Sequence, residues 1–165
     1  MSTDRNYNDE LKDNIGRKYN YGFDLDVMHP FMLESFKPFL QEGGLLELGS
    51  SKGDFTSRFE QLFDDIICVE ASIDAIDEAK QKVKSNVSFF NDTFENVVLP
   101  KKYNNIVMTH VLEHLDNPIE VLKRVNDEWL SDGGRFFLVT PNANAPSRQI
   151  AVKMGLISHN SEVTS

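Results

Sequence analysis

The chain has 165 residues, of which 40% are hydrophobic and 26% charged, and this suits one globular domain with a sizeable core. Its formal net charge of −9 disfavours a nucleic-acid partner, since phosphate backbones attract clustered Lys and Arg. The sequence has neither an apolar run of the roughly 18–20 residues that span a membrane nor a signal-peptide pattern, and its lone cysteine, Cys68, excludes a disulfide framework, so we expect a cytoplasmic protein with no membrane partner.

The N-terminal segment, residues 1–24, is polar and almost without periodic apolar positions, so we predict a flexible arm or a lid there. Apolar residues at helical spacing then predict a helix over His29–Leu40, in which Pro30 occupies a tolerated first-turn position. Residues 25–155 carry regular patterns and are predicted to form a single domain. Residues 156–165 form a polar tail without a strand pattern.

Five short apolar runs alternate with helical patterns along the predicted domain. The predicted strands are Leu45–Leu48, Ile66–Val69, Val87–Phe90, Asn105–Met108 and Arg135–Val139. The predicted helices cover 55–63, 73–83, 117–129, which is stopped by Gly133-Gly134, and 146–154, which is ended by Gly155. Strands that leave no wet face predict a parallel sheet covered on both sides, which is a doubly wound α/β fold. In such a fold, ligands bind beyond the carboxyl ends of the strands.

The turn after the first predicted strand reads Glu47-Leu48-Gly49-Ser50-Ser51-Lys52-Gly53. Gly49 permits a tight turn close to a ligand, and Gly53 lets the next helix pack closely, so a nucleotide-like cofactor is the natural interpretation. An ordinary strand-to-helix turn is the alternative. Glu70 ends the second strand 17 positions after Gly53, where an acidic side chain can accept hydrogen bonds from ribose hydroxyls. Asp92 follows the third strand and is placed to meet a base edge.

Three cofactor classes compete for this pattern. The chain lacks the phosphate-binding pattern of kinases and ATPases, G-x-x-x-x-G-K-[ST]. A dinucleotide site needs a glycine where Ser51 stands, and Glu47 would face a pyrophosphate unfavourably, so NAD is the second choice. A carboxylate at Glu47 instead suits a ligand with an ammonium and a sulfonium group, as in S-adenosylmethionine.

These residues make the chain resemble the class I S-adenosylmethionine-dependent methyltransferases, of the type that acts on small molecules or sugars, from about Leu25 to Gly155. The family's E/D-x-G-x-G-x-G segment matches with Ser51 in place of the middle glycine, and its strand-four V-L-E-H segment matches within 109–115. The resemblance implies a Rossmann-like fold and S-adenosylmethionine as cofactor. It assigns cofactor binding to Glu47, Gly49, Ser50, Gly53, Glu70, Ala71, Asp92, Thr93, Phe94, Thr109 and His110.

Histidines follow the fourth predicted strand and are the candidate catalytic residues. A hydroxyl acceptor must lose its proton during methyl transfer, and His110, supported by His114, is placed to act as the general base. The alternative is that both histidines only hydrogen-bond the loop backbone. Some members of the family bind a divalent ion here, which would make His110, Glu113 and His114 ligands. We expect no metal, because no fourth ligand is identifiable.

The segment after the fifth predicted strand is polar and resembles the corresponding loop of methyltransferases that act on sugars, polysaccharide precursors and quinone-type molecules. We predict that Asn142, Asn144 and Arg148 contact the methyl acceptor, together with His29 near the cofactor entrance. A capped loop with an exposed arginine is the alternative. The expected reaction is methyl transfer to an O or N atom of a small polar metabolite, such as a sugar or polysaccharide precursor.

The sequence departs from the family after the last predicted helix, where the family fold adds an antiparallel hairpin that has no counterpart before Ser165. The fifth strand would then be an exposed edge, which proteins usually cover or pair. We therefore expect either a shortened form of a longer enzyme or a sheet completed by another chain, with a homo-oligomer through this edge as one form. The alternative function is a catalytically incomplete cofactor-binding module or subunit that needs a partner.

Overall fold

The computed structural model describes residues 6–9, 24–156 and 158. Most of the predicted arm, 1–24, and of the predicted tail, 156–165, lies outside these residues, so the division into arm, domain and tail stays a prediction. Among the helices that are described, none is both long and apolar enough to cross a membrane.

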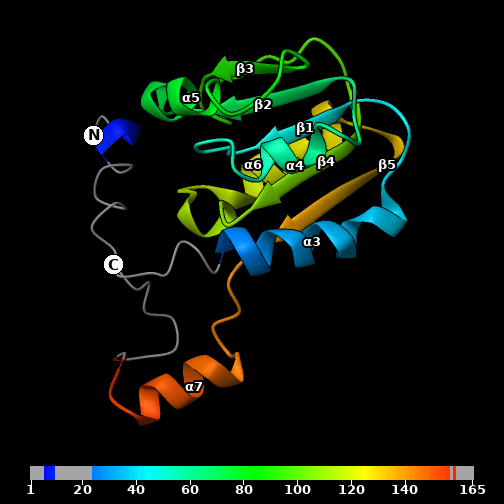
Figure 1. Cartoon of the computed structure of the whole chain (residues 1–165). Coiled ribbons are helices and arrows are strands. Elements are labelled where there is room, and N and C mark those ends of the chain that lie inside the picture. Colours follow the sequence, from blue (N-terminus) through cyan, green and yellow to red (C-terminus); the bar gives the residue numbers. More distant parts are fainter. Residues whose placement is uncertain (1–5, 10–23, 157, 159–165) are drawn as a thin grey trace.

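A five-stranded sheet forms the centre of the described structure (Figure 1). Its strands are β1 (Leu45–Leu48), β2 (Ile66–Glu70), β3 (Val87–Asn91), β4 (Tyr103–Thr109) and β5 (Leu130–Val139). All four neighbouring pairs are parallel, and the order is β3-β2-β1-β4-β5. This confirms the predicted Rossmann-like doubly wound fold. The strand order reverses between β1 and β4, which is where such sheets bind ligands.

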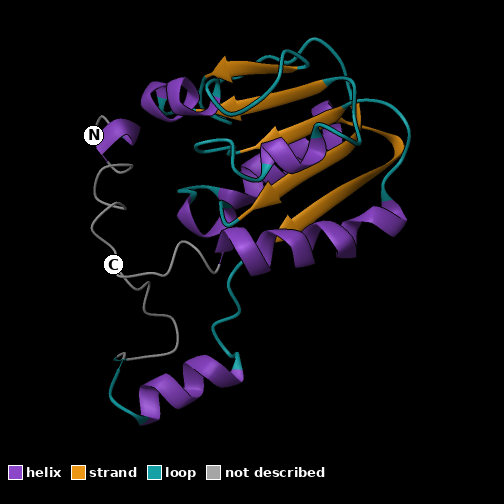
Figure 2. Ribbon diagram, viewed as in Figure 1, coloured by secondary structure: helices purple, strands orange, loops and turns teal. Residues whose placement is uncertain are grey.

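Helices cover both sides of the sheet (Figure 2). The helical elements between residues 24 and 156 are η1 (Asp24–Met28), α3 (His29–Phe36), η2 (Lys37–Phe39), α4 (Thr56–Phe59), α5 (Ile73–Ala79), η3 (Leu112–His114), α6 (Pro118–Arg124), η4 (Val125–Trp129) and α7 (Pro146–Lys153), and not all of them contact the sheet. Ser72 caps the N-terminus of α5, because its hydroxyl accepts a hydrogen bond from the Ala75 N–H. In Figure 1, α7 stands apart from the sheet.

The alternation of side chains along the buried strands divides the core into two layers. Leu45 of β1 packs with Met32, Leu33 and Phe36 of α3 on one face. The next residue, Leu46, packs with the α6–η4 helical segment on the opposite face. Since both faces of the central strands are covered, β1 is buried along its whole length.

Several predicted boundaries were wrong. The helix predicted over 73–83 ends at Ala79, and β4 and β5 begin at Tyr103 and Leu130, before the predicted Asn105 and Arg135. Two further differences have a clear physical reason. The apolar residues of 55–63 are mostly buried, but the α-helix covers only Thr56–Phe59 and the chain continues as turns. The Gly133-Gly134 pair does not stop a helix, because helical structure ends at Trp129 and both glycines lie within β5. Between the pairs Tyr103–Leu130 and Asn105–Arg135, β4 advances by two residues and β5 by five. The glycines accommodate this irregularity, and Gly133 has a φ of +75°.

Candidate functional site

A cavity of about 380 Å³ opens at the carboxyl ends of β1 to β4, beside the point where the strand order reverses. Twelve of the predicted site residues line it, namely His29, Glu47, Gly49, Ser50, Glu70, Ala71, Asp92, Thr93, Phe94, Thr109, His110 and His114. Five predicted residues do not line it, namely Gly53, Glu113, Asn142, Asn144 and Arg148. The structure thus brings together residues from four separate strand ends.

Glycine is required in the turn after β1 for two different reasons. Gly49 has a φ of +80°, and a Cβ atom there would collide with the Val111 side chain on the far side of the turn. Gly53 has a φ of +75°, and its Cβ atom would lie 2.9 Å from that of Ala79 in α5. Gly49 therefore lets the segment after β4 approach the turn closely. Gly53, which does not line the cavity, lets α5 approach it.

Ser51 stands where the family pattern has its middle glycine, and it adopts a φ of +45° that serine rarely takes. Two ion pairs with residues of α5 and the segment after it hold the turn in this shape. Lys52 forms an ion pair with Glu78 of α5 at 2.9 Å, and Asp54 forms one with Lys82 at 2.7 Å. These contacts fix the loop between β1 and α4 to the segment that follows β2.

Glu70, at the end of β2, presents its carboxylate to the cavity while two backbone groups hold it in place. The Ser51 N–H donates to Oε2 and the Ser72 N–H donates to Oε1, each at 2.9 Å. Burial raises the pKa of Glu70, and these backbone hydrogen bonds oppose the rise. Because a carboxylate can accept about four hydrogen bonds, Glu70 keeps acceptor capacity for hydroxyl groups of a ligand.

Glu47 is the most deeply buried acidic group of the site, with 2% of its surface exposed. The Thr56 hydroxyl donates a hydrogen bond to its Oε2 atom at 2.6 Å, and the Cys68 thiol lies 3.7 Å from the same atom. Burial raises the pKa of Glu47 to about 7, although the contacts with Thr56 and Cys68 oppose the rise. Burial also raises the pKa of the Cys68 thiol, so this cysteine stays protonated.

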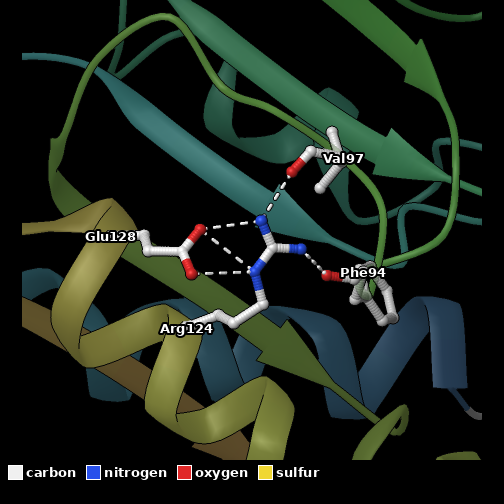
Figure 3. Close-up of polar contacts among 4 residues, drawn as sticks. All are labelled: Phe94, Val97, Arg124 and Glu128. Carbon is white, nitrogen blue, oxygen red and sulfur yellow. Dashed lines mark hydrogen bonds and ion pairs between the residues drawn. The ribbon is translucent and has the colours of Figure 1, made fainter.

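The segment after β3 forms another wall of the cavity. The Asp92 carboxylate accepts a hydrogen bond from the Thr93 N–H at 2.8 Å, and Phe94 follows in the same turn. Arg124 of α6 donates to the carbonyl oxygens of Phe94 and Val97 from behind this segment (Figure 3). The predicted base-contacting residues therefore share one short turn that Arg124 of α6 holds by two hydrogen bonds.

His110 follows β4 with a φ of +54°, and its N–H donates to the Val139 carbonyl oxygen of β5 at 2.8 Å. Its Nδ1 atom lies 3.7 Å from Oε1 of Glu113, and the Thr140 hydroxyl lies 3.3 Å from the other oxygen of Glu113. Left-handed backbone at a side chain of this size is uncommon and concentrates at functional sites. His114 ends η3 and also lines the cavity.

The predicted acceptor residues are divided by the structure. His29 lines the cavity, and its ring contacts that of Phe55 with 4.8 Å between the ring centroids. Asn142 and Asn144 are exposed and bonded to each other, because the Asn144 N–H donates to the Asn142 side-chain oxygen at 3.0 Å. Arg148 lies in α7, away from the cavity lining. Acceptor contact by the three residues after β5 stays a prediction.

Several residues of the site were not predicted from the sequence. Some of them simply line the cavity, such as Phe55 and Asp116, whereas Tyr7, Asn8 and Arg124 need a separate account. Tyr7 lines the cavity, and the Asn8 side-chain oxygen accepts a hydrogen bond from the Ser72 hydroxyl at 2.7 Å. Both belong to the polar segment that was predicted as a flexible arm or lid, in which no sequence pattern singled out these two residues. Arg124 was also missed. It stands close in sequence to the apolar positions Val121 and Val125, which are buried, and this placement indicates a side chain that packs along the core.

Metal ligands are not gathered in the part of the chain that the structure describes, where no group of three or more His, Cys, Asp or Glu side chains is arranged to hold an ion. The possible triad of His110, Glu113 and His114 is therefore not assembled. His110 and His114 line the cavity, but Glu113 is turned to His110 and Thr140.

Solved structures with the same fold include several methyltransferases. DhpI in complex with S-adenosylhomocysteine is 21% identical, with a TM-score of 0.67, and the match covers 80% of this chain and 64% of that chain. The plantazolicin methyltransferase BpumL in complex with a pentazolic desmethylPZN analog and S-adenosylhomocysteine is 20% identical, with a TM-score of 0.66, over 88% of this chain and 56% of that one. The N-methyltransferase NodS from Bradyrhizobium japonicum WM9 in complex with S-adenosylhomocysteine is 18% identical, with a TM-score of 0.69, over 81% and 72%.

At these identities the likeness shows a shared fold, and the chain spans 56–64% of the length of the first two structures. A comparison with curated protein sequences gave no match. The family model of a methyltransferase domain matches residues 23–163, which include the whole sheet and every residue of the cavity except Tyr7. The chain therefore belongs to the methyltransferase domain family, as its resemblance implied.

Proposed function

We propose that the chain binds S-adenosylmethionine in this cavity and transfers its methyl group to an O or N atom of a small polar metabolite, such as a sugar or polysaccharide precursor. The observation that carries the proposal is the convergence of Glu47, Glu70 and Asp92 from the ends of three adjacent strands on one cavity. Family membership and the cofactor complexes of structures with the same fold support it.

The residues of the cavity fit this cofactor chemically. Glu47 would face its positively charged amino acid part, because a buried carboxylate with a pKa of about 7 ionises readily beside a cation. Glu70 would accept hydrogen bonds from ribose hydroxyls, and Asp92 with Thr93 and Phe94 would contact the base. Gly49, Ser50, Ala71 and Thr109 would supply close backbone approach around these groups.

The bound cofactor supplies a methyl group that is already activated by a sulfonium. The protein mainly aligns the acceptor and excludes water. His110 would take the proton that a hydroxyl acceptor loses, and its backbone is fixed for this role by the hydrogen bond to Val139. The Glu113 carboxylate at 3.7 Å would stabilise the imidazolium that forms. His114 and His29 would border the acceptor.

A second candidate is a cofactor-binding module that needs a partner for turnover. The observation in its favour is that Asn142, Asn144 and Arg148, which were predicted to contact the acceptor, do not line the cavity. Within the described residues, β5 also pairs on one side only. A second copy that pairs with this edge would complete the sheet, and its presence would show as a concentration-dependent mass in sedimentation. An NAD-binding protein is the lesser alternative.

Calorimetric titration tests the proposed function. Wild type should bind S-adenosylmethionine and S-adenosylhomocysteine but not NAD, and Glu70→Ala should abolish binding of both sulfur ligands. Asp132→Ala is the matched control, because it removes an exposed carboxylate outside the cavity lining. Binding without turnover on any acceptor would favour the module. Failure of a folded sample to bind either sulfur ligand would overturn the proposed cofactor.

A further inference from the structure

We infer that Arg124 is a positioning residue that makes the site selective for the cofactor's adenine, an inference that rests on the proposed function. Arg124 does not line the cavity. It acts through the turn of residues 92–97, whose members Asp92, Thr93 and Phe94 are proposed to contact the base.

The guanidinium group of Arg124 is held by an aromatic ring and a carboxylate, in addition to the turn. Its side chain is 15% exposed, and its central carbon lies 4.8 Å from the ring centroid of Trp129, which is itself buried. Glu128 accepts hydrogen bonds from Nε at 3.0 and 3.1 Å and from one terminal nitrogen at 2.7 Å. Figure 3 shows the planar fork held between this carboxylate and the turn. The donors that remain therefore point in set directions.

Those donors bind two backbone carbonyl groups of the turn. One terminal nitrogen donates to the Phe94 carbonyl oxygen, and the other donates to the Val97 carbonyl oxygen at 2.8 Å. Within the turn, the N–H groups of Asn96 and Val97 both donate to the Thr93 carbonyl oxygen. Arg124 thus donates hydrogen bonds to two carbonyl groups for which the turn supplies no N–H donor. These bonds fix the position of Phe94 in the cavity wall.

Other parts of the site do not depend on this arginine. Glu47 is held by Thr56, and Glu70 is held by the N–H groups of Ser51 and Ser72. Loosening the 92–97 turn should therefore disturb recognition of the base and leave the sites for the ribose and the amino acid part intact. This predicts a loss of base selectivity, which a general loss of stability would not produce.

The test compares S-adenosylhomocysteine with S-inosylhomocysteine, which differ only in the base. Wild type should prefer the adenine ligand by at least about tenfold in Kd, since one well-placed hydrogen bond between buried partners is worth about that factor. In Arg124→Lys, whose single ammonium cannot reach both carbonyls in the same fork geometry, the ratio of the two dissociation constants should fall towards one.

Two further variants complete the experiment. Arg135→Lys is the matched control, because Arg135 also donates to backbone carbonyls, those of Gly133 and Gly134, but lies outside the cavity lining. It should keep the wild-type ratio. Glu128→Ala removes the carboxylate that aligns Arg124 and should give an intermediate ratio, so it decides the matter if Arg124→Lys does not fold.

The outcomes separate the inference from the function on which it rests. Absence of S-adenosylhomocysteine binding by folded wild type overturns the proposed function and this inference together. Binding by wild type without preference for adenine overturns the inference alone. Equal weakening of both ligands in Arg124→Lys, with the ratio kept, also overturns it, because that result would mean that Arg124 is only a structural residue.

Discussion

The Ser51 N–H donates a hydrogen bond to the Glu70 carboxylate at 2.9 Å, across the ends of two adjacent strands. The residue that departs from the family's glycine pattern is thereby tied to the residue proposed to bind the ribose. Ser51 supplies this N–H from a left-handed backbone, with a φ of +45°. The contact with Glu70 therefore depends on the backbone conformation of residue 51, and the Ser51 side chain takes no part in it.

Ser51→Gly should stabilise the protein slightly. Left-handed backbone costs an L-residue roughly 1 kcal/mol, and the extra freedom of glycine in the unfolded chain offsets roughly half of that, so we expect a gain of about 0.5 kcal/mol in the free energy of unfolding. Urea denaturation measures this change. Ser50→Gly is the control, because Ser50 has no positive φ and should lose stability. A Ser51→Gly protein less stable than wild type would contradict the inference that the backbone of Ser51 is strained.

Glu70→Gln should weaken cofactor binding by about 10- to 100-fold, in line with the roughly 1.5–3 kcal/mol of a hydrogen bond to a charged group. The amide has one oxygen to share between the Ser51 and Ser72 N–H groups, and its NH2 group cannot accept from a ribose hydroxyl. Calorimetry with S-adenosylhomocysteine measures the loss. Glu78→Gln, which breaks an ion pair of the same loop with Lys52, should change the affinity little. Equal losses in the two variants would refute a specific role for Glu70.

Glu47→Gln should change how stability depends on pH. Burial raises the pKa of Glu47 from 4.5 to about 7, so between these values the folded protein holds a proton that the unfolded chain has released. The stability contributed by this group is therefore complete below the unfolded pKa and is lost as the pH rises through the folded pKa. The loss amounts to about 3 kcal/mol.

Denaturation at about pH 5 and about pH 8 should show this loss in wild type and not in Glu47→Gln. Other titrating groups, including Glu70 with its own raised pKa, contribute to both proteins and cancel in the comparison. Glu42→Gln provides an exposed control and should follow wild type. The same pH dependence in wild type and Glu47→Gln would show that Glu47 does not hold the proton.

Asn8→Ala should speed release of the cofactor. Its side-chain oxygen accepts from the Ser72 hydroxyl at 2.7 Å, and the neighbouring Tyr7 lines the cavity, so this contact keeps Tyr7 over the site. One lost hydrogen bond of about 1 kcal/mol predicts a dissociation rate raised by about fivefold. Stopped-flow displacement measures the rate, with Asp132→Ala as the control, because Asp132 is exposed and lies outside the cavity lining. An unchanged rate would show that residues 6–9 do not retain the ligand.

His110→Asn should separate binding from turnover. Asparagine tolerates left-handed backbone, so the loop should keep its shape and cofactor affinity should be retained. Methyl transfer to a hydroxyl acceptor should fall by about 10²- to 10⁴-fold, whereas a neutral amine needs no such base and should be affected little. Initial rates over a panel of sugar and amine acceptors measure both. Undiminished transfer to a hydroxyl acceptor would exclude His110 as its base.

The strands were predictable because each is a short apolar run bounded by turn residues, although the edge strand β3 is only partly buried, unlike β1 and β2. Leu45–Leu48 was predicted to the residue, and β2 and β3 to within one residue. Boundaries set by glycine were harder, since a glycine pair marks a helix end and a strand irregularity equally well in sequence. At Gly133-Gly134 the irregular pairing with β4 decided the matter, and that pairing is a long-range contact.

For the candidate site, sequence reasoning located residues that follow strands, because the carboxyl ends of parallel strands must share an edge. It could not locate groups whose contribution depends on packing. Arg124 reaches the 92–97 turn from a helix about 30 positions later, and Asn8 reaches Ser72 across 64 positions. Helical periodicity at 55–63 identified a buried face without fixing where helical hydrogen bonding ends.

The single thiol of the chain has a practical consequence. Cys68 is fully buried in β2 and borders Glu47, and the sequence offers a labelling reagent no other cysteine. A fluorescent maleimide can therefore react only when the centre of the sheet opens, so its labelling rate reports the free energy of that opening. A ligand that occupies the cavity should slow the labelling, which gives a screen for unknown methyl acceptors that requires no turnover.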